Sequence, residues 1–99
     1  MQKKNYKYKV TETKQFKKSI KKLKKQGKDM TKIIKIINQL LNKEKLDIKN
    51  RDHALINTKQ YKNCRECHIE PDWLLVYKYI DDRLILMLIN TGSHSEILE

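Results

Sequence analysis

The residues best suited to chemistry are three histidines, His53, His68 and His94, and the carboxylate of Asp72. Imidazole has an unperturbed pKa of about 6.5, so near neutral pH one histidine can accept a proton while another donates one. RNA cleavage needs both steps: a base removes the proton of the 2′-hydroxyl that attacks the phosphate, and an acid protonates the departing 5′-oxygen. If these side chains meet, they could cleave RNA without a metal or a protein nucleophile.

Two helices are expected in the first half of the chain. Before them, apolar residues alternate with lysines in a short strand that contains Tyr6, Tyr8 and Val10. Apolar residues then recur at helical spacing from Phe16 to Leu23, and Gly27 provides a stop. Asp29 can cap a second helix, whose apolar stripe ends at Leu41. This pattern predicts a helical hairpin that covers one face of a sheet.

After residue 50 the apolar pattern becomes strand-like. Runs at 61–69, 73–80 and 83–90 are rich in β-formers, and they are separated by a turn containing Pro71 and by the pair Asp81 and Asp82. Connections this short force neighbouring strands to be antiparallel. The sequence therefore predicts an α+β fold, a small antiparallel meander with two N-terminal helices on one face, as a single domain over residues 1–99.

The strand directions place the candidate groups at one end of this sheet. The first run ends near His68, the second starts after Asp72, and the third ends shortly before His94. His53 reaches the same end if residues 52–56 run toward the polar turn at 57–60. Surrounding lysines could then hold an RNA strand, and Trp73 or a tyrosine could stack a base. Taken singly, each residue also has a structural interpretation, and Trp73 could belong to the core.

The stretch from Cys64 to His68 spells CRECH, which matches the short pattern of c-type haem attachment. In a strand, however, Cys64 and Cys67 would point to opposite faces and could not grip one haem edge. Zinc would need a second pair of ligands, and a redox pair would sit at the start of a helix. We therefore expect two reduced, partly buried cysteines, with no haem, zinc or other cofactor.

The charge is concentrated in the first half of the chain. The net charge is +11, and residues 1–49 hold 17 lysines against four acidic residues. Such a surface favours a polyanionic partner, although lysines on amphipathic helices can also form only a solvated face. The longest apolar run, 84–89, is far shorter than the roughly 20 residues of a membrane span, and no secretory signal is recognised. We expect a cytoplasmic protein.

Three blocks resemble the YafQ-type branch of the RelE/ParE toxin superfamily: DHAL at 52–55, RECHIEPDWLLVY at 65–77 and TGSHSEIL at 91–98. The resemblance implies a type II toxin, a ribosome-dependent mRNA endonuclease that a cognate antitoxin holds inactive. It also implies that the basic helices contact rRNA. The family's catalytic positions match His53, His68, Asp72 and His94. His94 is the expected proton donor, Asp72 and His68 act as base or orienting groups, and His53 supports the charge network.

The chain departs from the family pattern at two positions. Asn90 stands where the family often has an arginine that can stabilise the transition-state phosphate, and Leu98 stands near a position that is often phenylalanine. These changes bear on rate and codon preference more than on fold. Arg65, Arg83 or Lys62 could supply the missing charge.

Two other functions are compatible with this sequence. A ParE-like toxin would share the fold and poison DNA gyrase without catalysis, but it would lack the histidine set. A plain RNA-binding module would depend on the lysine-rich helices alone.

Overall fold

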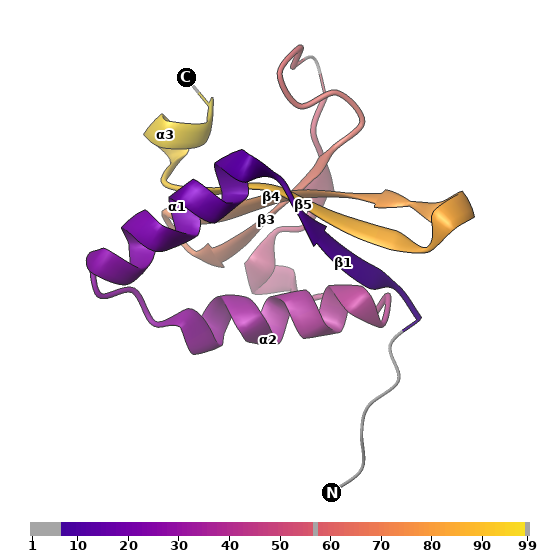
Figure 1. Cartoon of the computed structure of the whole chain (residues 1–99), viewed down its shortest axis with the longest axis horizontal. Coiled ribbons are helices and arrows are strands. Elements are labelled where there is room, and N and C mark those ends of the chain that lie inside the picture. The colour runs from indigo at the N-terminus through magenta and orange to yellow at the C-terminus, as the bar shows by residue number, and fades with distance from the viewer. Residues whose placement is uncertain (1–6, 57, 99) are drawn as a thin grey trace, which may run out of the picture.

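The protein is described by a computed structural model that covers residues 7–56 and 58–98, with only the backbone described for residue 98. Five strands form one sheet, two long helices pack on it and a short helix ends the chain (Figure 1). The elements are β1 (Lys9–Glu12), α1 (Lys14–Lys25), α2 (Met30–Leu41), η1 (Ile48–Asn50), β2 (His53–Ala54), β3 (Arg65–Glu70), β4 (Trp73–Ile80), η2 (Asp81–Arg83), β5 (Ile85–Gly92) and α3 (His94–Leu98). None of the helices within the described residues has the length and apolarity needed to cross a membrane.

The order of strands across the sheet is β1-β5-β4-β3-β2. Strands β3, β4 and β5 form the predicted antiparallel meander, and β2 adds an antiparallel edge. At the other edge β1 pairs in parallel with β5, with Lys9 opposite Ile85. The α+β fold with its N-terminal helices on one face of the sheet is therefore confirmed.

Both helices begin and end for local reasons. The Thr13 hydroxyl accepts the Phe16 N–H at the start of α1, and Gly27 follows the helix with a positive φ of 80°. The Asp29 carboxylate accepts the Thr31 N–H at the start of α2, as predicted. These caps satisfy backbone groups that have no partner within the helix.

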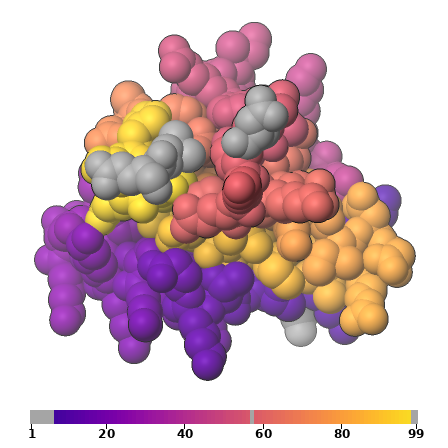
Figure 2. All heavy atoms as spheres, turned by 90° about the horizontal axis from the view of Figure 1, so that it is seen from above, coloured from indigo at the N-terminus to yellow at the C-terminus, as the bar shows by residue number. Residues whose placement is uncertain are grey.

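The sheet has a separate apolar core on each face. The larger core lies under α1 and α2, where Phe16, Leu23, Ile33 and Leu40 pack with side chains of β3, β4 and β5, including Cys67. The smaller core lies on the other face, between the sheet, the segment before β3 and α3; it contains Tyr61, Cys64, Leu74, Val76 and Ile97. Figure 2 shows this segment and α3 side by side. Alternate residues of β4 thus face different cores.

Several predicted boundaries were wrong. The first strand begins at Lys9, after Tyr8, and Tyr6 lies outside the described residues. Strand β3 begins at Arg65 rather than at residue 61, because residues 61–63 form a turn in which Asn63 has a φ of 62°. The third strand of the meander runs from Ile85 to Gly92 rather than over 83–90, because residues 81–83 form a short 3-10 helix.

The two cysteines are free and buried in different cores. Cys67 lies in the core under the helices, and Cys64 lies in the core on the opposite face. The prediction that they point away from each other is confirmed. Burial also raises the pKa of both thiols, so neither is readily ionised.

Candidate active site

His94 and Asp72 are joined by two hydrogen bonds to the same carboxylate oxygen. Asp72 lies in the turn between β3 and β4, and His94 is the first residue of α3. Asp72 Oδ1 accepts the backbone N–H of His94 at 2.9 Å and lies 2.6 Å from its Nδ1. An ionised carboxylate can only accept, so Nδ1 carries a proton. The other ring nitrogen, Nε2, is then the atom available for proton transfer.

Asp72 is suited to orient His94 rather than to accept a proton. The backbone N–H of His94, followed by its ring hydrogen bond, lowers the pKa of Asp72. A carboxylate with a lowered pKa is a weaker base. Its negative charge also lies beside the ring that it holds, as the aspartate of a catalytic triad does. The side chains of both residues are exposed, at 47% for His94 and 70% for Asp72.

His68 lies beside this pair on β3. Its ring centroid is 5.4 Å from that of His94, with the two planes tilted by 57°. Its Nδ1 lies 3.3 Å from the carbonyl oxygen of Pro71, and its Nε2 lies 3.8 Å from Oε1 of Glu66. The Asn50 side chain donates to the backbone carbonyl of His68 at 2.8 Å and so fixes this part of β3 to η1. Both ring nitrogens of this buried histidine therefore face oxygen atoms.

His53 reaches the same group through the sheet register. It stands directly opposite Glu66 in the pairing of β2 with β3, and its Nε2 is 3.7 Å from Glu66 Oε1. Its Nδ1 lies 2.7 Å from the carbonyl oxygen of Arg51. The side chain is half exposed. His53 is thus next to Glu66, and within the described part of the structure it makes no polar contact with Asp72 or His94.

Glu66 is the member of this group that sequence reasoning missed. Its side chain is 3% exposed, it lies near both His53 and His68, and its Oε2 has no hydrogen-bond partner among the described residues. A buried carboxylate costs free energy unless opposite charge or hydrogen bonds offset the lost hydration. The available signal was its position two residues before His68 in a strand, which puts both on one face.

Trp73 is a core residue, so the stacking expectation was wrong. Its side chain is 1% exposed, and its indole N–H donates to Thr91 Oγ1 at 2.9 Å. No ring face is free to receive a base. The alternation of β4 directs Trp73 to the helix-covered face together with Leu75 and Tyr77.

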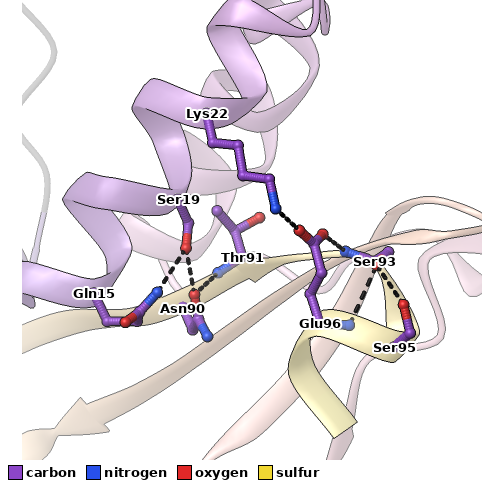
Figure 3. Close-up of polar contacts among 8 residues, drawn as sticks. All are labelled: Gln15, Ser19, Lys22, Asn90, Thr91, Ser93, Ser95 and Glu96. Atoms are coloured by element: carbon purple, nitrogen blue, oxygen red, sulfur yellow. Dashed lines mark hydrogen bonds and ion pairs between the residues drawn. The ribbon is translucent and has the colours of Figure 1, made fainter. Parts of the chain in front are cut away.

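Asn90 is also turned inward. It is 7% exposed, its Oδ1 accepts from the Ser19 hydroxyl and the Thr91 N–H, and its Nδ2 donates to the Tyr61 hydroxyl. Both ends of the amide are therefore used within the fold and neither is offered to a phosphate. Figure 3 shows its contact with α1.

The two arginines that were candidates for the missing charge, Arg65 and Arg83, do not join the histidines. Arg65 donates to Asp52 at 3.3 Å, and the Tyr77 hydroxyl donates to the same carboxylate. Arg83 lies in η2, at the end of the β4 and β5 hairpin that is opposite to Asp72 and His94. It therefore cannot supply charge at the site, contrary to that expectation. Leu98 ends α3, and its side chain lies outside the described part of the structure.

The groups brought together form a row: His53, Glu66, His68, His94 and Asp72. The row crosses three elements of the fold, β2, β3 and α3, and the β3–β4 turn. Across residues 7–56 and 58–98, no group of three or more histidine, cysteine, aspartate or glutamate side chains could hold a metal ion. The row can offer proton donors and acceptors.

The sequence of this chain is similar to those of known bacterial toxins. A sequence model of the YafQ family, a bacterial toxin of type II toxin-antitoxin systems, matches residues 8–99. The mRNA interferase toxin YafQ of Escherichia coli strain B / BL21-DE3 is 36% identical over 84 residues, which span 84% of this chain and 87% of that protein.

Solved structures show the same similarity. A chain in the E. coli DinJ-YafQ toxin-antitoxin complex matches with a TM-score of 0.83 and 31% identity, over 94% of this chain and 99% of that one. A metal-bound toxin from Helicobacter pylori matches with a TM-score of 0.84 and 37% identity, over 91% and 98% of the two chains. The present chain belongs to the YafQ family of type II toxins.

Proposed function

We propose that this chain is an endoribonuclease that cleaves mRNA on the ribosome, in the cytoplasm. The observation that carries the proposal is the 2.6 Å contact of His94 Nδ1 with Asp72, with the His68 ring beside it. The mRNA interferase activity named for the E. coli relative supports the same substrate class.

In the proposed reaction the 2′-hydroxyl attacks the adjacent phosphate and the 5′-oxygen leaves. His94, protonated on Nε2, gives its proton to the departing 5′-oxygen. Asp72 holds the ring by Nδ1 and stabilises the imidazolium before transfer. The proton of the 2′-hydroxyl passes to the histidine and carboxylate group around His68, in which His68 acts as a base or as an orienting residue beside Glu66.

His53 adds a second imidazole beside Glu66, on the exposed side of the row. It is placed to share the charge of this carboxylate rather than to touch the leaving oxygen.

The surface around the row suits the proposed partners. Helix α1 contributes seven exposed lysines and no acidic residue: Lys14, Lys17, Lys18, Lys21, Lys22, Lys24 and Lys25. Helix α1, in indigo and violet, lies next to the yellow α3 in Figure 2. Such a helix would attract rRNA or mRNA phosphates at long range. The E. coli relative was solved with the antitoxin DinJ, and we infer a cognate antitoxin here, with an acidic segment over the basic surface.

The proposal is tested by induced expression and mapping of new mRNA 5′ ends. We expect cuts in register with codons in cells that express the natural chain, and no cuts with His94→Gln at equal levels of folded protein. Arg83→Gln is the control, because this residue lies at the far end of the hairpin. Growth arrest by His94→Gln without new RNA ends would overturn the proposal and favour a non-catalytic target.

A further inference from the structure

The segment that carries His94 is closed by reciprocal hydrogen bonds between Ser93 and Glu96 (Figure 3). The backbone N–H of Ser93 donates to Glu96 Oε1 at 2.9 Å, and the backbone N–H of Glu96 donates to Ser93 Oγ at 3.3 Å. This is the capping box, in which a serine at the helix N-cap and a glutamate three residues later satisfy each other's free backbone donors. His94 is the first helical residue inside the box.

Glu96 also connects α3 to α1. Its second oxygen, Oε2, pairs with the ammonium group of Lys22, across the space between the two helices (Figure 3). The Lys22 hydrogen bond, followed by the Ser93 backbone N–H, lowers the pKa of Glu96 to about 2. The carboxylate therefore remains ionised throughout the range in which histidines work.

The carboxylate lies close against the backbone of the β5 end. A Cβ atom at Gly92 would come within 2.9 Å of Glu96 Oε1, which is too close for ordinary packing. Glycine at this position lets the glutamate side chain fold back over Ser93. The other anchor of α3 is Ile97, which is 1% exposed in the smaller core.

These contacts determine whether His94 can reach Asp72. Among the described residues, both side-chain hydrogen bonds of Asp72 go to His94, one to its backbone N–H and one to its ring. The backbone bond requires the start of α3 to face the β3–β4 turn. The ring bond then depends on the direction that this backbone gives to the side chain. A helix of five residues has little stability of its own, so its orientation depends on its anchors.

We propose that Glu96 is a positioning residue for His94: its capping bond to Ser93, more than its ion pair with Lys22, holds the imidazole on Asp72. The ion pair is solvent-exposed, with 60% of the Lys22 side chain accessible, and exposed pairs contribute little. The consequence for cleavage rests on the proposed function, whereas the consequence for the His94 ring does not.

Three variants separate the two interactions of Glu96. Glu96→Gln keeps an acceptor for the Ser93 N–H but removes the charge, because glutamine also serves in capping boxes. Glu96→Ala removes both interactions. Lys22→Met removes the ion pair alone, and Lys21→Met is its control for the loss of one exposed α1 charge.

The first measurement is ¹⁵N NMR of the His94 imidazole in the free protein. We expect the Nδ1–H form and its hydrogen bond to be retained in Glu96→Gln and Lys22→Met and lost in Glu96→Ala. An unchanged His94 signal in Glu96→Ala, in a chain that keeps its sheet by circular dichroism, would overturn the proposal. So would a loss of the bond in Lys22→Met that Lys21→Met does not show.

The second measurement is single-turnover cleavage of mRNA on purified ribosomes. Because small displacements of reacting groups cost up to about 100-fold, we expect Glu96→Ala to be about 10- to 100-fold slower, and Glu96→Gln to recover most of this rate. In the His94→Gln background, Glu96→Ala should add no further loss, since it acts through His94. An additive loss would overturn the positioning role. If the ring signal changes but cleavage does not, the positioning role stands and the proposed catalytic role of His94 fails.

Discussion

The substitution Thr91→Val tests whether Trp73 is locked into the core at the edge of the candidate site. Thr91 is 2% exposed, and its hydroxyl accepts the Trp73 indole N–H at 2.9 Å while it donates to the Leu74 carbonyl at 2.6 Å. Valine has nearly the same shape, so the change removes both hydrogen bonds without opening a large cavity. The polar partners that remain are buried.

The expected cost follows from the two lost hydrogen bonds. Leaving the buried indole N–H unpaired costs about 1 to 3 kcal/mol, and losing the bond to the Leu74 carbonyl, which belongs to a central strand, costs about 0.5 to 1.5 kcal/mol. The free energy of unfolding should therefore fall by about 1.5 to 4.5 kcal/mol. A domain of this size has a total of about 5 to 15 kcal/mol. The assay is urea unfolding followed by the fluorescence of Trp73, which is the single tryptophan in the chain. A His94→Gln background would permit expression of all variants.

Two controls define the result. Thr91→Ser keeps the hydroxyl and should lose only about 1 kcal/mol for the buried methyl group. Thr11→Val makes the same chemical change at an exposed position of β1 and should stay within about 0.5 kcal/mol of the parent. If Thr91→Val were as mild as Thr11→Val but weakened RNA binding, Trp73 would be a mobile stacking residue and the interpretation of the core would be wrong.

Three further predictions concern the site and its surroundings. Glu66→Gln should slow single-turnover cleavage on ribosomes about tenfold or more while the sheet stays folded, because it removes the carboxylate that faces His53 and His68. An unchanged rate would exclude a role for the charge of Glu66 in cleavage. Arg83→Gln should leave that rate within about twofold, and a larger loss would mean that η2 contacts the RNA. The lowered pKa of Glu96, about 2 against a usual 4.5, means that its stabilising contribution is present above about pH 4.5 and is lost as the pH falls toward 2. In thermal unfolding, Glu96→Gln should therefore be less stable than the parent at pH 6 and equally stable near pH 2. The difference at pH 6 should be at most about 1 kcal/mol, because the ion pair of Glu96 with Lys22 is exposed to solvent. A difference that does not change with pH would contradict the lowered pKa of Glu96.

Much of the fold could be predicted because its signals are local. Helical spacing, the Asp29 cap and Gly27 identify α1 and α2, since each depends on residues within one turn. The meander follows from two connections that are too short for a parallel crossover, so that neighbouring strands must be antiparallel. The same connections indicated that His68, Asp72 and His94 share one end of the sheet.

Other features depended on contacts between distant parts of the chain. The parallel pairing of β1 with β5 and the ion pair of Lys22 with Glu96 join residues more than 70 positions apart. Pairing register decides that His53 stands opposite Glu66, and no local pattern reports that register. Alternation could have shown that Glu66 and His68 share a face, but not that a histidine on β2 would meet this carboxylate.

The amino-acid sequence by itself determined the two long helices, the antiparallel meander, the basic character of α1, the turn that holds Asp72 and the family. The tertiary structure decided which side chains face each core and which face solvent. It buried Trp73 and Asn90, assigned Arg65 to Asp52 and joined Glu66 to two histidines. The physical reason is range: backbone preference acts between near neighbours, whereas the environment of a side chain is set by the packing of the whole sheet.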